Sequence, residues 1–116
     1  MTGKAYSLTL PEPPSANRWW RKFKNRMVLS AEAREYKANV AAICMVNRVK
    51  PFAGEVCVTL AWYRGRKAGD LDKRIGVVLD AMQGHFYAND SQIVSLSADR
   101  YEDKENPRLH VTVRAA

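Results

Sequence analysis

The chain has 116 residues, of which 47% are hydrophobic and 27% charged, a balance that excludes an intrinsically disordered chain. This length fits one domain with one hydrophobic core, so we expect a single domain over residues 1–116. Nineteen Lys and Arg residues against twelve Asp and Glu give a formal net charge of +7, which favours a polyanionic partner such as a nucleic acid.

The first half of the chain predicts two strands and one long helix. Apolar and polar residues alternate over residues 5–10, which predicts a strand that the following prolines end. Residues 27–29 predict a second, short strand. Ser30 is a good N-cap for a helix that runs to about Val49, before Pro51.

The second half predicts three strands around a second helix. Residues 54–63 form the strongest strand pattern, and both of its faces are largely apolar, which indicates a central strand or one covered on both sides. An amphipathic helix follows and ends at Gly84 as its C′ residue. Residues 93–98 and 109–113 predict the last two strands. The fold class expected from this order is α+β, a small mixed sheet with two main helices packed on one side.

Aromatic and basic residues are interleaved between residues 15 and 26. Cations that hold phosphates and flat rings that stack on bases are the combination that single-stranded or distorted nucleic acid requires. A second basic group flanks the start of the second helix. The alternatives are that the rings pack into the core and that the cations are only solvated surface. The residues predicted to contact DNA are Arg18, Trp19, Trp20, Arg21, Lys22, Lys24, Arg26, Arg64, Arg66, Lys67 and Arg74.

Three aspartates bracket the second helix. Asp70 and Asp72 lie at its start and Asp90 in the loop after it, and we expect the three to meet at one edge of the molecule. Singly, each has a structural explanation as a helix cap, a dipole partner or a turn residue. Together, in a basic protein, they predict a magnesium or manganese site for phosphodiester hydrolysis. Asp80 lies two turns beyond Asp72, about 12 Å along the helix, and is left out of this site.

The two cysteines, Cys44 and Cys57, lie in apolar surroundings and are expected to be buried thiols in a reducing compartment. With only two widely separated histidines beside them, they do not form a zinc ligand set. We find no signal sequence and no stretch long enough to span a bilayer. The expected protein is soluble and intracellular, with no membrane partner and no small-molecule cofactor besides the divalent metal.

The chain resembles the RusA family of Holliday junction resolvases, small endonucleases of bacteria and their prophages. The resemblance is carried by Asp70-Leu71-Asp72, by Val78-Leu79-Asp80-Ala81-Met82, by Asn89-Asp90-Ser91-Gln92-Ile93 and by the opening Pro13-Pro14-Ser15-Ala16-Asn17-Arg18. It implies a cytoplasmic homodimer that binds four-way DNA junctions and makes two symmetric, magnesium-dependent nicks. It also implies that Asp70, Asp72 and Asp90 bind the metal.

The chain departs from the family pattern at Gly76, where the family usually has a lysine, and at Lys73, where it usually has an asparagine. A lysine one turn beyond Asp72 would stabilise charge that develops on the phosphate, and glycine cannot. We predict that Lys73 replaces it as the catalytic cation, with Arg74 as the alternative. The missing lysine keeps open a second function, a weakly active or non-catalytic module that binds branched DNA, and an RNA-directed nuclease is a third.

Overall fold

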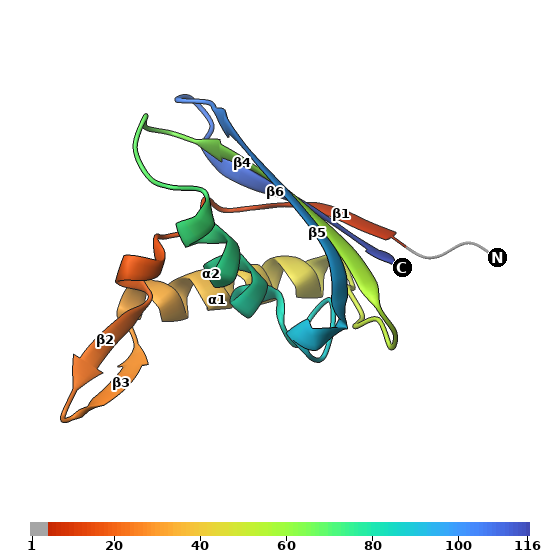
Figure 1. Ribbon diagram of the computed structural model, residues 1–116, viewed down its shortest axis with the longest axis horizontal. Helices are drawn as coiled ribbons and strands as arrows, with labels where there is room; N and C mark the ends of the chain where they lie inside the picture. The colour runs from red at the N-terminus through yellow and green to blue at the C-terminus, as the bar shows by residue number, and fades with distance from the viewer. Residues whose placement is uncertain (1–4) are drawn as a thin grey trace.

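A computed structural model describes residues 5–116 of the chain (Figure 1). Its strands are β1 (Ala5–Leu10), β2 (Trp20–Phe23), β3 (Arg26–Leu29), β4 (Val56–Arg64), β5 (Ile93–Glu102) and β6 (Arg108–Ala115). Its α-helices are α1 (Ala31–Val46) and α2 (Asp72–Met82), and two short 3-10 helices are η1 (Ala16–Arg18) and η2 (Asp90–Gln92).

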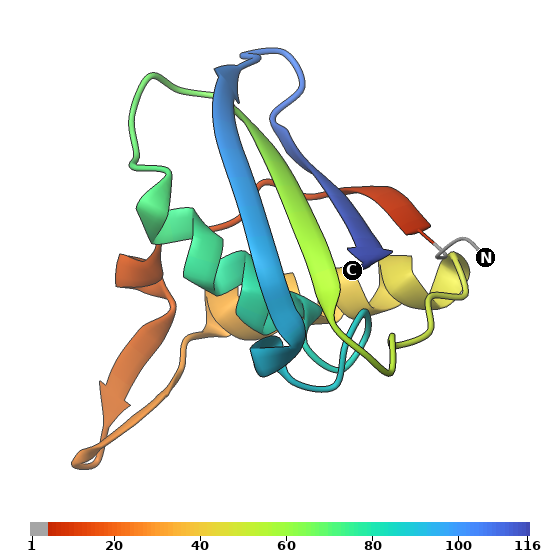
Figure 2. The same ribbon diagram turned by 45° about the vertical axis from the view of Figure 1, so that its right-hand side comes forward.

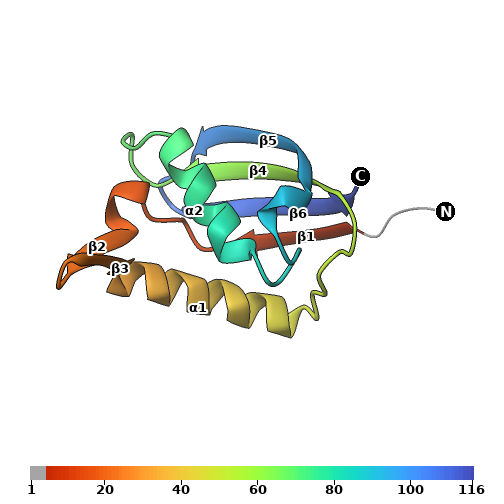
Figure 3. The same cartoon turned by 60° about the horizontal axis from the view of Figure 1, so that its bottom comes forward.

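Four strands form one sheet in the order β1-β6-β4-β5, with both α-helices on the same face (Figure 3). β4 and β5 are parallel, while β6 pairs antiparallel with both β1 and β4. Because parallel neighbours need a crossover, α2 forms the connection of a β-α-β unit. The expected α+β architecture, a mixed sheet with two helices on one side, is confirmed.

The core lies between the sheet and the helices. Val56, Val58, Leu60 and Trp62 of β4 point inward and are at most 2% exposed. They meet buried residues of α1 and α2 in one hydrophobic cluster. β4 lies between β6 and β5, so the prediction of a central strand is confirmed.

The long helix α1 begins where the sequence predicts. The Ser30 Oγ accepts a hydrogen bond from the Ala33 N–H at 3.0 Å and donates one to the Arg18 carbonyl at 2.6 Å. The helix ends at Val46, three residues before the expected end at Val49. Arg48 adopts a left-handed conformation with φ of 54°, which a continuing helix does not allow.

A second, two-stranded sheet pairs β2 with β3 as a hairpin that projects away from the body of the protein (Figure 2). β3 was expected, whereas β2 was not. Its four residues are all exposed, so the strand has no apolar alternation that would reveal it. Lys24 and Asn25 form the turn with φ of 47° and 62°, as a two-residue type I′ turn requires.

The two cysteines differ in environment, which gives a direct test of the packing of α1. Cys44 is buried, and this burial raises the pKa of its thiol to about 11, whereas Cys57 is only partly buried. Because the thiolate is the reactive form, we expect iodoacetamide at pH 8 to alkylate Cys57 in the folded protein and to spare Cys44. Peptide mass spectrometry reads out both sites. Equal labelling of the two in native protein would contradict this packing.

Candidate nucleic-acid interface and metal site

Asp70 and Asp72 lie at the start of α2, just after the loop that leaves β4. The helix begins at Asp72, and its N-cap position is Leu71, with no capping hydrogen bond from a side chain. The structure therefore excludes the explanation that Asp70 caps the helix. Both acids are exposed, and their carboxylates form no hydrogen bond or ion pair within residues 5–116. Their oxygens are free to bind a ligand.

Asp90 has a fixed backbone and a free carboxylate. It opens η2, where the Asn89 and Gln92 side chains form a capping box. The Gln92 side chain also donates to the carbonyls of Phe52 and Gly54, at 2.8 and 2.7 Å, and so attaches η2 to the segment before β4. The Asp90 N–H donates to the Gln83 Oε1 at 3.1 Å, while the carboxylate is exposed and has no partner among the described residues.

The three aspartates do not meet within one subunit, and this corrects the expectation from the sequence. In a β-α-β unit, the loop into the helix and the loop out of it lie at opposite ends of the strands. Asp72 begins α2, which is about 15 Å long for its 11 residues, and Asp90 begins η2, after the far end of that helix. Figure 1 shows the start of α2 and the segment that follows its end on opposite sides of the helix. Accordingly, residues 5–116 contain no group of three or more His, Cys, Asp or Glu side chains placed to hold a metal ion.

The charge around Tyr87 agrees with this position of Asp90. Burial raises the pKa of Tyr87, and the negative charges of Asp90 and Asp80 raise it further. Asp80 lies near the end of α2, so Asp90 shares the electrostatic environment of that end of the helix. Asp80 also lines the depression that contains Asp72, whereas Asp90 does not.

Trp19 is buried, so its ring has no exposed face on which a base could stack, contrary to the sequence prediction. It is 3% exposed, and its ring packs edge-on against Tyr36 with 6.3 Å between the ring centroids. Its Nε1 donates to the Asp80 Oδ2 at 3.1 Å, and Lys37 Nζ lies 3.7 Å from the same oxygen. The alternative that one ring packs into the core is correct for Trp19, which anchors the base of the hairpin to α1 and α2.

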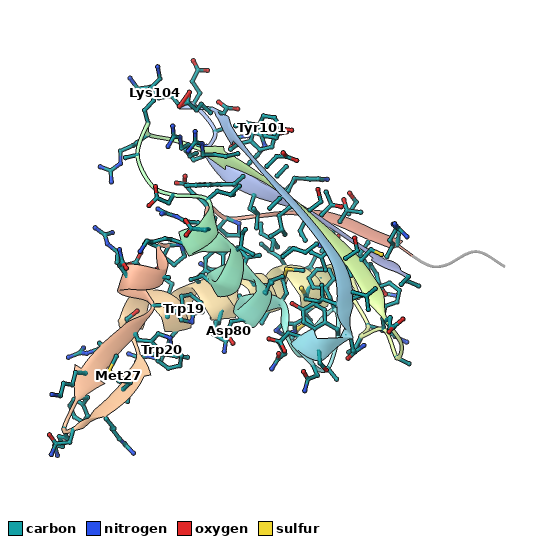
Figure 4. All side chains as sticks on the ribbon, viewed as in Figure 1. Trp19, Trp20, Met27, Asp80, Tyr101 and Lys104 are labelled. Carbon is teal, nitrogen blue, oxygen red and sulfur yellow. The ribbon has the colours of Figure 1, made fainter. Side chains whose placement is uncertain are left out.

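The hairpin beyond Trp19 presents both aromatic and basic side chains to solvent. Trp20 is 52% exposed, Phe23 46% and Met27, which no sequence pattern marked, 60%. Figure 4 shows Trp20 and Met27 on the hairpin. Trp20 and Met27 lie on the same face of the hairpin, on diagonal positions of the two strands. The basic residues of the hairpin are also exposed: Arg21, Lys22, Lys24 and Arg26. The hairpin therefore has the composition and the accessibility of a surface that binds nucleic acid.

Arg64 is not available to DNA, which corrects a second predicted contact. Its side chain is 11% exposed and donates to the Glu102 Oε1 at 2.8 Å and to the Gly69 carbonyl at 3.2 Å. It therefore supports the loop that carries Asp70. Arg18, Arg66 and Lys67 retain exposed positions.

The side chains of Lys73 and Arg74 line two different depressions of the surface. Asp72, Lys73 and Gly76 line one depression of about 300 Å³ at the base of the hairpin, together with Trp20. Arg74 instead lies over the Trp62 ring, 4.7 Å from its centroid, in a separate and larger cleft. Of the two cations proposed to replace the missing lysine, only Lys73 lines the same depression as an aspartate of the predicted metal site.

The fold and these surfaces define a small basic α+β protein with unpaired acids beside a cationic hairpin. A family model described as Endodeoxyribonuclease RusA matches residues 11–114, so the chain belongs to the RusA family of endodeoxyribonucleases. The crossover junction endodeoxyribonuclease RusA of Escherichia coli (strain K12) is 32% identical over 111 residues, which cover 93% of this chain and 92% of that protein. The protein of the same name from Enterobacteria phage 82 is 31% identical over the same coverage.

The described part of the chain includes no helix that is both long enough and apolar enough to cross a membrane.

Proposed function

We propose that this protein is a homodimeric, magnesium-dependent endonuclease that resolves four-way DNA junctions by two symmetric nicks. The observation that carries the proposal is the set of exposed, unpartnered carboxylates beside a cationic, aromatic hairpin in a chain of the RusA family. The name of these relatives, crossover junction endodeoxyribonuclease, indicates the substrate. Such an enzyme would act in the cytoplasm of a bacterial or phage-infected cell.

The acids fit a hard divalent cation. Asp70 and Asp72 offer carboxylate oxygens one residue apart, with no soft ligand beside them, and these are donors that magnesium and manganese prefer. Asp70, Asp72 and Asp90 would hold the ion. When bound, it would polarise a phosphoryl oxygen and lower the pKa of the attacking water.

A second copy of the chain explains how three separated acids would act on one ion. Within one subunit, α2 keeps Asp90 away from Asp70 and Asp72. In a two-fold dimer, Asp90 of the partner subunit would complete the ligand set at the start of α2, and the symmetry would repeat the site. Two equivalent sites match a junction whose own symmetry requires two matched cuts.

Lys73 would supply the positive charge next to the cut phosphate. It lines the depression that contains Asp72, and a cation there would stabilise charge that develops on the phosphate oxygens. Trp20 would stack on a base exposed at the branch, while the hairpin cations bind backbone phosphates.

The alternative function is a module that binds branched DNA and cuts it weakly or not at all. The observation that favours it is Gly76, which leaves the family's usual lysine position without a side chain. A synthetic four-way junction, a linear duplex of the same sequence and an RNA junction, each with magnesium, separate these functions. We expect paired nicks in the DNA junction alone. Retardation of the junction in a gel without cleavage at any concentration of divalent ion would instead support the binding module.

A further inference from the structure

A cleft of about 580 Å³ lies apart from the hairpin, beside the loop that carries Asp70. Its walls come from the proline-rich segment after β1, from α1, and from the end of β4 with the loop into α2. This volume is in the range of pockets that hold small organic groups. Gly69, the neighbour of Asp70, lines it, so an occupant would lie next to the predicted metal ligands.

Charged and polar side chains of both signs face this cleft without pairing with one another. Glu32, Glu35 and Asn39 are spaced along one side of α1, and Arg18 and Arg66 belong to other segments that line the cleft. None of these five side chains forms a hydrogen bond or ion pair among the residues that the structure describes. The cleft therefore presents hydrogen-bond acceptors and donors that are available to a ligand.

Arg74 is the best-positioned donor. Its guanidinium lies over the buried Trp62 ring, and its Nε is buried without a hydrogen-bond partner. Gly69 makes this position accessible, since a Cβ at Gly69 would lie 2.8 Å from a terminal nitrogen of Arg74 and φ is 100°.

Glu12 forms the fixed part of the wall. Its Oε2 accepts hydrogen bonds from the Trp62 Nε1 at 3.0 Å and from the Gly65 N–H at 3.1 Å. This contact holds the proline-rich segment against the end of β4. Because Glu12 already accepts these two hydrogen bonds, the carboxylates in the cleft that have no partner are those of Glu32 and Glu35.

We infer that the cleft binds one unstacked base of the junction, close to the cut, and so contributes to the choice of cleavage site. The inference rests on the proposed function. A base edge carries donors and acceptors together, which matches unpaired carboxylate, amide and guanidinium groups, whereas a phosphodiester offers only acceptors and would leave the glutamate carboxylates without a donor. Carboxylates accept from exocyclic amino groups, so the cleft favours a base with an amino group over thymine. Unstacking costs least at a branch, where pairing is already interrupted.

Fluorescence of 2-aminopurine tests this inference without any cutting. The analogue is placed singly at each position within three nucleotides of the branch, and the junction is bound in EDTA. We expect the wild-type protein to raise the fluorescence several-fold at one position of the cut strand. The double variant Glu35→Gln, Asn39→Ala should lose this rise. Glu55→Gln is the matched control, because Glu55 lies just before the opposite end of β4 and does not line the cleft.

An abasic nucleotide at the responding position provides a second measurement, in magnesium. It should slow cutting by wild type roughly ten-fold, the size expected for one specific base contact, and should slow the double variant much less. A uniform fluorescence response along the strand, or a double variant that behaves like Glu55→Gln, would overturn the inference. Because the wild-type protein would still cut the unmodified junction in that case, such a result would leave the proposed function intact.

Discussion

Asp72→Asn is expected to lower the rate of junction nicking by more than about 100-fold, since even residues that only support a metal ligand contribute 10- to 100-fold. Junction binding in EDTA should be unchanged or tighter, because the exposed carboxylate repels phosphate when no metal is bound. Single-turnover cutting and gel retardation measure the two effects, and Asp70→Asn and Asp90→Asn should behave alike. Asp99→Asn is the control, because Asp99 is exposed on β5 and its side chain forms no hydrogen bond or ion pair among the described residues.

Mixed dimers show whether Asp90 acts across the subunit boundary. If the partner subunit supplies it, a dimer of one Asp72→Asn chain and one Asp90→Asn chain contains one intact site and one doubly altered site. Co-refolding the two inactive variants should then restore nicking of a single strand. If all three acids act within one subunit, the mixed dimer has no intact site and stays inactive, which would contradict the proposed dimer.

Gly76→Lys is expected to raise the nicking rate about ten-fold or more, because one well-placed donor to a developing anionic oxygen contributes about 10²- to 10³-fold in other enzymes. The site has room for it, since nothing lies within 4 Å of a Cβ built on Gly76. The side chain would enter the depression lined by Asp72 and Lys73. Burst-phase cutting of a labelled junction measures the change.

Gly76→Gln separates charge from helix stability. Glutamine and lysine both stabilise α2 relative to glycine, by about 0.5 to 1 kcal/mol, but only lysine adds a cation. Lys73→Ala should reduce cutting in the natural background and reduce it less when it is combined with Gly76→Lys. Equal rates for Gly76→Lys and Gly76→Gln would show that charge at this position does not limit the reaction.

The strands and helices that pack on the core could be predicted because their buried residues make apolar positions repeat at a regular spacing in the sequence. β1 was predicted with its observed bounds, and the inward residues of β4 are those of its alternating pattern. Ser30 was recognisable because its cap depends only on residues within one turn. β5 extends four residues past the expected end at Ala98, where exposed residues paired with β4 carry no apolar signal.

The candidate site was harder to predict, because it depends on contacts between distant segments. Trp19 and Trp20 are adjacent and chemically alike, yet one is buried and the other exposed. The difference depends on Asp80, which is 61 residues away in the chain. The separation of Asp90 from Asp72 follows from the parallel pairing of β4 with β5, and no short-range pattern specifies that pairing.

The pairing of β1 has a consequence for how the protein forms during synthesis. Among the described strands, β1 pairs with β6 alone, with Ala5 opposite Arg114, so the backbone of the first strand cannot form its sheet hydrogen bonds until the last strand has been made. Pairing β1 with β6 closes a loop that contains nearly the whole chain, which is entropically costly. Contacts between positions so far apart in the sequence also slow folding. A ribosome-bound nascent chain therefore has an unpaired N-terminal strand until translation is nearly finished, and a stop codon before β6 would leave both β1 and one edge of β4 open to association with other chains.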